Sequence, residues 1–240
     1  MKRFYKDATV GRAENGGSSD TVDGGFVVLL DGRSIKTPAK NGLVVTSKIV
    51  AEAIAQEWQA QGEKIDPATM PMMRFAATAI DRITTQRKAV IAEISAFGGH
   101  DMLCYRGVEP ELAALQASLW QPLLDWASNT LGAKLEVTSG ISSIDQDASA
   151  LAILEKCVCE CSDMELSALH TITSITGSLI IALALTRGEI DVDKAWEATV
   201  VDERFQEIVW GRDAEAEDRL IARQQSMVDG ARFFTLCTDA

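Results

Sequence analysis

The sequence is 240 residues long, 47% hydrophobic, with 35 acidic and 23 basic residues and a formal net charge of −12. This composition excludes a mainly disordered chain because it supplies enough apolar side chains for a sizeable core. The negative charge repels nucleic acid and anionic membrane surfaces, so the expected partner is a protein or a small molecule.

Cysteine usage and the N-terminal residues indicate the compartment. Of the five cysteines, Cys157, Cys159 and Cys161 are too crowded for a disulfide framework, which favours a reducing environment. The first residues, MKRFYKDATV, resemble neither a secretory signal nor an organelle presequence. We therefore expect a bacterial cytoplasmic location, or a processed mature form of the chain.

Residues 1–46 differ from the rest of the chain because short β-prone runs alternate with Gly, Asn, Asp and Ser. Asp31-Gly32 separates two such runs and predicts a tight hairpin, in which both central residues have positive φ. Residues 11–20 are predicted to form a loop.

Helical periodicity begins at residue 47. Val50, Ile54 and Trp58 form one apolar stripe over residues 47–61, and Gly62 is the predicted C-cap. A second helix is expected to begin at Pro71. Its predicted buried face comprises Met73, Ala76, Ile80 and Ile83.

A third helix is predicted over residues 86–97, ending at a diglycine. Its predicted buried residues are Val90, Ile94 and Phe97.

Five further helical segments are predicted in the second half of the chain. The first, residues 109–131, contains Pro122, which should kink or split it. A short extended piece over residues 134–138 follows. The remaining helical segments are 147–161, one that starts at a capping box formed by Ser162 and Glu165 and ends near Gly188, 192–210 with a break near Thr199, and 212–234.

These patterns predict an α+β fold that is predominantly α-helical. A β-rich unit, residues 1–46, carries helices from 47–100, and residues 101–240 form a C-terminal helical domain. The uncharged run 166–186 is long enough to span a bilayer, but its first half is rich in Ser, Thr and His. We therefore expect a helix buried in a protein core and no integral membrane segment.

No motif for catalysis or for metal binding stands out. On a helix, Cys159 lies about 200° from Cys157, so the three clustered thiolates cannot converge on one ion. The two histidines, His100 and His170, are isolated, and the sequence has no nucleophile elbow, phosphate-binding loop or paired zinc motif. We predict no catalytic residue, no metal and no cofactor.

Acidic residues crowd the segment 202–218, which also holds Phe205 and Trp210. Most such clusters are solvated helix faces. Glu203, Glu207 and Trp210 share one helical face, and an aromatic ring beside carboxylates is typical of an interface patch. The alternative is a small hydrolase or isomerase that uses this cluster for acid–base chemistry.

Several segments together resemble the assembly chaperone of the ATP synthase catalytic head, the family that holds the unassembled α subunit in mitochondria and alphaproteobacteria. The resemblance covers nearly the whole chain in order. The segments that carry it are LLDGRSIKTP (29–38), AIAQEWQAQGEKIDPATMPMMRFAATAIDR (53–82), DMLCYRG (101–107), LQASLWQPLLDW (115–126) and DERFQEIVWGRDAEAEDR (202–219).

The resemblance implies a chaperone that binds the α subunit, hydrolyses no nucleotide and shields the α subunit until β replaces it. Relatives of this kind occur in the mitochondrial matrix. The candidate partner-binding residues are Glu203, Gln206, Glu207, Trp210, Asp213 and Glu215. Trp58 and Asp81 match other family motifs, and a structural role is favoured for Trp58 because it lies on an apolar stripe.

Three interpretations therefore remain: a chaperone, an enzyme, and an interaction module of another complex. A deep pocket that holds two or more of Glu203, Glu207 and Asp213 would favour the enzyme. A broad apolar groove with an acidic rim would favour the chaperone.

Overall fold

The computed structural model describes residues 1–13, 24–140, 142–211 and 213–238, and the chain folds into two compact units. The fold is mainly helical, with a small strand region near the N-terminus, as the sequence predicted. The first unit comprises Met1–Arg87, Asp163–Ala168 and Arg232–Ala240, and the second comprises Lys88–Ser162 and Leu169–Ala231.

These units differ from the predicted division at residue 100, because two late segments pack within the first unit. The Thr84 hydroxyl donates to Asp163 at 3.0 Å. Phe75 stacks on Phe233 with ring centroids 5.2 Å apart. Contacts between positions so far apart in the chain leave no local sequence pattern.

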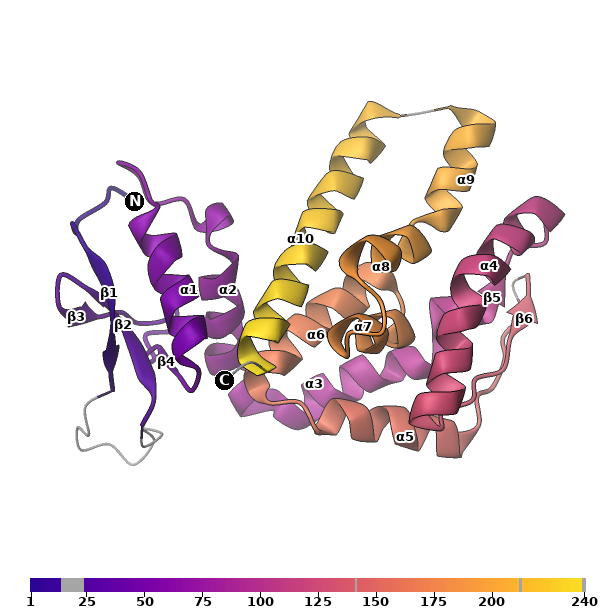
Figure 1. Ribbon diagram of the computed structural model, residues 1–240, viewed down its shortest axis with the longest axis horizontal. Coiled ribbons are helices and arrows are strands. Elements are labelled where there is room, and N and C mark those ends of the chain that lie inside the picture. Colours follow the sequence, from indigo (N-terminus) through magenta and orange to yellow (C-terminus); the bar gives the residue numbers. More distant parts are fainter. Residues whose placement is uncertain (14–23, 141, 212, 239–240) are drawn as a thin grey trace. The chain divides into compact units, whose positions relative to one another are not determined.

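The first unit contains an antiparallel sheet in which strand β2 (Phe26–Leu30) is central. It pairs with β1 (Ala8–Arg12) on one side and with the short strands β3 (Arg33–Ser34) and β4 (Val44–Val45). Strand alternation buries Val28 and Leu30. The helix α1 (Lys48–Gln59) contacts β1 and β2 and lies along the sheet in Figure 1.

The predicted hairpin turn is present. Asp31 and Gly32 have φ values of 48° and 81°, which match the two positive φ angles that a two-residue turn requires. The predicted loop over residues 11–20 is wrong at its start, because Gly11 and Arg12 belong to β1. Its remaining part, from residue 14, lies outside the described residues.

Helices α1 and α2 (Pro71–Thr78) begin where the sequence predicted. The Ser47 side chain accepts a hydrogen bond from Val50 N at 3.3 Å, and Pro71 occupies the first turn of α2. The predicted C-cap at Gly62 is wrong, since α1 ends earlier, at the αR residue Ala60.

The buried face of α2 also differs from the prediction. Ala76 and Ile83 are buried, but Met73 and Ile80 are only half-buried, while Met72 and Phe75 fill the core. A π-turn, η2 (Ala79–Ile83), follows α2 directly and leads into α3 (Thr84–Ala96). The buried residues Met72, Phe75, Ala76, Ala79 and Ile83 still recur every three or four residues, so the prediction chose a neighbouring stripe of the same helix.

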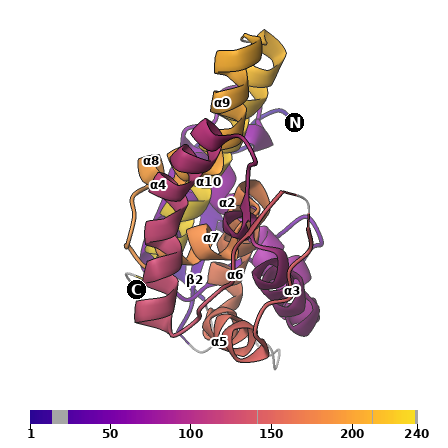
Figure 2. The same cartoon turned by 90° about the vertical axis from the view of Figure 1, so that its right-hand side faces the viewer.

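In the second unit, Val90 and Ile94 of α3 are buried as predicted, and Phe97 is half-buried. The strand β5 (Tyr105–Arg106) pairs in parallel with β6 (Thr138–Ser139), close to the predicted extended piece. Figures 1 and 2 show the remaining helices. They are α4 (Pro110–Trp126), α5 (Ala148–Cys159), α6 (Asp163–Thr176), α7 (Leu179–Thr186), α8 (Val192–Thr199), α9 (Val201–Trp210) and α10 (Ala214–Thr238). Two of these helices, α6 and α10, have residues in both units.

The helix α4 runs through Pro122 without being split, and a π-turn extends it to Leu131. The break near Thr199 is confirmed, because Val200 separates α8 from α9. The apolar run 166–186 is not one helix. Gly177, with φ of 64°, ends α6, and the Ser178 side chain accepts from Ile181 N at 3.0 Å to begin α7.

The helix α7 lies in the core, where Leu179, Ile180 and Ile181 have no exposed surface. Trp120 of α4 is also fully buried, and its indole donates to the Ala198 carbonyl at 2.8 Å. Within the described part of the chain, no helix combines the length and apolar character needed to cross a membrane.

Candidate functional site

The helices α9 and α10 form a hairpin that extends past α7 and α8 of the same unit (Figures 1 and 2). The helix α9 begins after Val200 and ends at Gly211, whose φ of 89° and ψ of 168° suit glycine. Asp213 accepts a hydrogen bond from Glu215 N at 3.0 Å at the start of α10.

Ion pairs tie the two helices of this hairpin together. Arg204 on α9 contacts Glu207 at 2.8 Å and Glu217 of α10 at 2.9 Å. Glu217 and Glu207 both raise the pKa of the Arg204 guanidinium, because they stabilise its charged form. Glu203 pairs with Arg223 at 3.0 Å, and Arg223 also donates to the Ile175 carbonyl at 3.0 Å.

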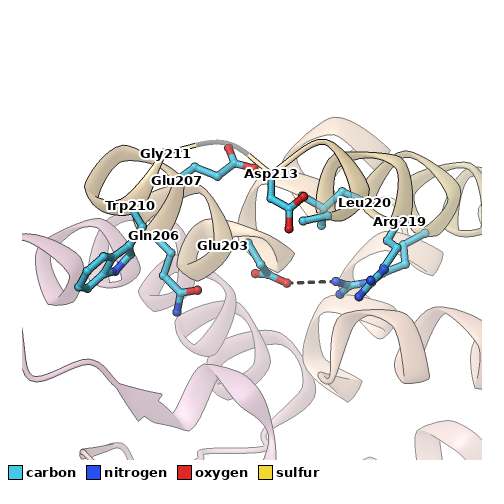
Figure 3. Close-up of a pocket in the computed structure, with 10 residues that line it drawn as sticks. Glu203, Gln206, Glu207, Trp210, Gly211, Asp213, Arg219 and Leu220 are labelled. Atoms are coloured by element: carbon cyan, nitrogen blue, oxygen red, sulfur yellow. Dashed lines mark hydrogen bonds and ion pairs between the residues drawn. The ribbon is translucent and has the colours of Figure 1, made fainter.

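A cavity of about 500 Å³ lies between α9 and α10 (Figure 3). Five of the six predicted partner-binding residues line it: Glu203, Gln206, Glu207, Trp210 and Asp213. The sixth, Glu215, is exposed and pairs with Arg219, which itself lines the cavity. The spacing of Glu203, Glu207 and Trp210 therefore places them on one surface, as the helical pattern predicted.

Large apolar side chains are exposed at the end of α9. Ile208 is 80% exposed, Val209 56% and Trp210 85%. A second cavity, of about 440 Å³, lies on another side of α9 and includes Phe205 and Ile208 together with Leu115 of α4. The hairpin thus combines an apolar end with a band of carboxylates.

The carboxylates are poorly arranged for acid–base chemistry, although the cavity does bring Glu203, Glu207 and Asp213 together. Arginines already bind the first two. The described residues that line this cavity include no histidine, serine, threonine or cysteine. Neighbouring Asp202 accepts from the Gln116 amide at 2.7 Å, which attaches α9 to α4. This arrangement favours recognition over acid–base chemistry.

The cysteine cluster has the geometry expected from its spacing. Cys157 is buried, Cys161 half-buried and Cys159 exposed. No group of three or more potential ligands for a metal ion occurs among the residues that the structure describes.

Asp81 and Trp58, which match other motifs, lie in the first unit. Asp81 accepts hydrogen bonds from the Thr37 hydroxyl at 2.6 Å, the Asn41 amide at 2.8 Å and Ala39 N at 3.1 Å. Burial alone would raise the pKa of Asp81, but these hydrogen bonds together lower it. Trp58 is half-buried, and its carbonyl accepts from Tyr5 at 2.6 Å.

Sequence reasoning missed the exposed pair Ile208 and Val209, and it missed the arginines that hold the carboxylates. The run Ile208-Val209-Trp210 was a usable signal, because three consecutive large apolar residues at a helix end exceed what one buried face accommodates. The pairing of Arg223 with Glu203 has no comparable signal, since the two residues lie 20 positions apart.

Solved structures with the same fold define the class of this protein. Atp12 from Paracoccus denitrificans is 40% identical, with a TM-score of 0.91 and 98% of each chain covered. Atu1473 from Agrobacterium tumefaciens is 41% identical, with a TM-score of 0.90, and the match covers 98% of this chain and 85% of that one. Both share the small strand region followed by a larger helical part, which makes the chain an α+β protein of the Atp12 fold.

Sequence comparisons agree with this class. The mitochondrial protein atp12 of Schizosaccharomyces pombe is 23% identical over 224 residues, which cover 88% of this chain and 74% of that protein. Residues 2–128, more than half of the chain, match the model of the ATP12 chaperone protein. The chain belongs to the ATP12 chaperone family.

Proposed function

We propose that this protein binds the unassembled α subunit of the ATP synthase catalytic head and prevents its aggregation until α and β subunits assemble. Membership of the ATP12 chaperone family and the resemblance along nearly the whole chain support this client. In this proposal the protein works in the bacterial cytoplasm, hydrolyses no nucleotide and is not an enzyme.

The observation that carries the proposal is the exposed apolar end of α9. Ile208, Val209 and Trp210 are each more than half exposed and adjoin one another. Exposed apolar clusters mark surfaces that another molecule covers, because each square ångström removed from water contributes roughly 25 cal/mol. In this proposal, an apolar surface of the unassembled α subunit packs against this end of α9.

The carboxylates around this apolar end add selectivity. Glu203 and Glu207 are held in place by arginines, so they are ordered before a client arrives. Ordered charges at an interface rim mainly raise the association rate and exclude partners of the same charge. A basic patch beside an apolar surface on the client fits this arrangement.

Refolding of the isolated α subunit tests the proposal. Light scattering should fall when the protein is added at equimolar concentration, with or without ATP. The double variant Ile208→Ser/Trp210→Ser should lose most of this effect, because it removes the apolar contact and leaves the packed core intact. Val108→Ser is the matched control, since Val108 is 71% exposed elsewhere in the same unit.

Two results would count against the proposal. If the double variant reduced light scattering as much as the native protein does, the end of α9 would be excluded as the client surface. A strict requirement for ATP hydrolysis by this protein would contradict the proposed mechanism and revive an enzymatic interpretation.

A further inference from the structure

Two adjoining cavities in the first unit, well away in sequence from α9, form an extended groove. Their volumes are about 710 and 640 Å³. They share four lining residues, Lys36, Trp58, Ile65 and Pro67. Trp58 therefore lies where the cavities meet, and the groove runs past its ring in both directions.

The groove is mainly apolar on both sides of Trp58. Phe4, which is 62% exposed, lines one cavity, and Met70 and Met73 line the other. Methionine side chains adapt to partners of different shape, which suits binding of varied apolar side chains. The combined volume exceeds what one small side chain would fill.

Hydrogen bonds within the protein fix the walls of this groove. The Glu57 carboxylate accepts from Met72 N at 2.7 Å and from Met73 N at 2.8 Å, which attaches α2 to α1. The Gln61 amide donates to Thr69 at 3.0 Å and accepts from Asp66 N at 2.7 Å, which fixes the connecting segment. A groove formed in advance loses little conformational entropy on binding.

The charges that line the groove are opposite in sign to the net charge of the chain. Four lining residues are basic, Arg33, Lys36, Arg74 and Arg82, and two are acidic. Both acidic groups are engaged within the protein: Asp31 accepts from Lys6 N and Asp7 N, and Asp81 accepts from the loop at residues 37–41. Arg33 and Lys36 are exposed and have no ion-pair partner among the described residues.

We propose that this groove, defined by Trp58 and the two cavities beside it, binds an extended polypeptide segment that alternates apolar and acidic side chains. The apolar side chains fill the cavities on both sides of Trp58, and the acidic side chains reach Arg33, Lys36 and Arg74. This surface differs from the α9–α10 hairpin in position and in charge. Its existence does not depend on the identity of the client proposed above.

Two fluorescently labelled decapeptides test the proposal with the full-length protein. One alternates Leu and Asp, and the other alternates Leu and Lys. Fluorescence anisotropy should show saturable binding of the Leu-Asp peptide, weakened as salt rises, and at least tenfold weaker binding of the Leu-Lys peptide.

Variants locate the binding site. Lys36→Glu should weaken binding of the Leu-Asp peptide about tenfold or more, and Met73→Ser should weaken it without changing the charge. Lys156→Glu is the matched control, because Lys156 is exposed on α5 outside the groove. Melting temperatures of all three variants establish that each is folded.

Equal affinity for the two peptides would overturn the proposal, since charge would then play no part. Binding that survives Lys36→Glu and Met73→Ser but is lost in Trp210→Ser would place the peptide on the hairpin instead. A single-stranded oligonucleotide that competes as well as the Leu-Asp peptide would identify a general anion site and would also overturn it.

Discussion

Asp101 is a fully buried carboxylate in the second unit. The backbone hydrogen bonds that it accepts connect the short helical turn Met102–Cys104 to α7. It accepts from Leu103 N at 3.1 Å and from Ile180 N, at the start of α7, at 3.0 Å. Burial raises the pKa of Asp101 to about 6, although hydrogen bonds from Ser178 and from the backbone oppose the change. The folded state therefore binds a proton here more tightly than the unfolded state does.

This raised pKa predicts an unusual dependence of stability on pH. The contribution of Asp101 is fully present below about pH 4 and is lost as pH rises through about 6. Compared with Asp101→Asn, the native protein should lose roughly 2 kcal/mol of unfolding free energy between pH 4 and pH 7. Urea unfolding at a series of pH values measures this difference.

Asp147 supplies a control of opposite sign. Hydrogen bonds from Ser149, and then from Ala150, lower the pKa of Asp147, so the stability it contributes is present above its ordinary pKa and is lost on acidification. The advantage of the native protein over Asp147→Asn should therefore grow with rising pH. If both variants showed the same trend, the assignment for Asp101 would be wrong.

Trp58 gives a second prediction about the stability contributed by a single residue. Its ring packs edge-on against Tyr5, with centroids 5.6 Å apart, on the helix whose Val50 and Ile54 are buried. Trp58→Arg should lower the free energy of unfolding by about 3 kcal/mol, because it removes packing and places a charge beside apolar groups.

Thermal melting measures the effect of Trp58→Arg, and Trp210→Arg is the matched control. Trp210 is 85% exposed, so the same substitution there should change stability by less than about 0.5 kcal/mol. An unchanged melting temperature for Trp58→Arg would show that Trp58 has no structural role.

Among the elements, the junction between α6 and α7 depends on one glycine. Gly177 has φ of 64°, where a side chain is strained, whereas its added Cβ would meet only Met102 at 3.8 Å. Gly177→Ala should therefore destabilise the protein by roughly 1–2 kcal/mol through backbone strain rather than steric overlap.

Gly62→Ala is the control for this junction, because Gly62 has an ordinary φ and no heavy atom within 4 Å of an added Cβ. It should be neutral or slightly stabilising, since alanine reduces the freedom of the unfolded chain. Similar chemical denaturation midpoints for the two variants would contradict the argument from φ.

The α9–α10 hairpin gives the prediction for the candidate site. The side chains of Glu203 and Arg223 are 39% and 38% exposed, so solvent screens their ion pair and it stabilises the fold by less than about 1 kcal/mol. Glu203→Lys should lower the melting temperature only slightly and weaken α-subunit binding tenfold or more, mainly through slower association.

Glu189→Lys is the charge-matched control, since Glu189 is exposed outside the hairpin. Binding kinetics at low and moderate salt separate the two roles. Unchanged binding by Glu203→Lys would remove Glu203 from the client surface, and a collapsed melting temperature would make it a structural residue.

For the molecule as a whole, local patterns predicted most elements, and long-range contacts account for the differences. The Asp31-Gly32 turn and the start of α2 at Pro71 follow from backbone preferences of single residues, so sequence was sufficient. The end of α6 at Gly177 was missed because the surrounding run is uninterrupted by charge. Assembly of the first unit from three chain segments depends on contacts that no local pattern encodes.

In the candidate site, too, local sequence patterns predicted the positions of side chains along one helix but not their long-range partners. Helical spacing correctly placed Glu203, Glu207 and Trp210 on one surface. Sequence did not reveal that arginines hold the two carboxylates, because side-chain partners on a neighbouring helix depend on tertiary packing. The basic groove around Trp58 was missed for that reason also, since its walls come from separate stretches of the first unit.

Recovery of the tagged protein from its own cells, followed by quantification of the ATP synthase subunits that accompany it, tests the central claim most directly. The proposed function predicts enrichment of the free α subunit over β, and loss of that enrichment in Ile208→Ser/Trp210→Ser but not in Val108→Ser. Equal recovery of α and β, or recovery of neither, would contradict the claim that this protein holds the unassembled α subunit.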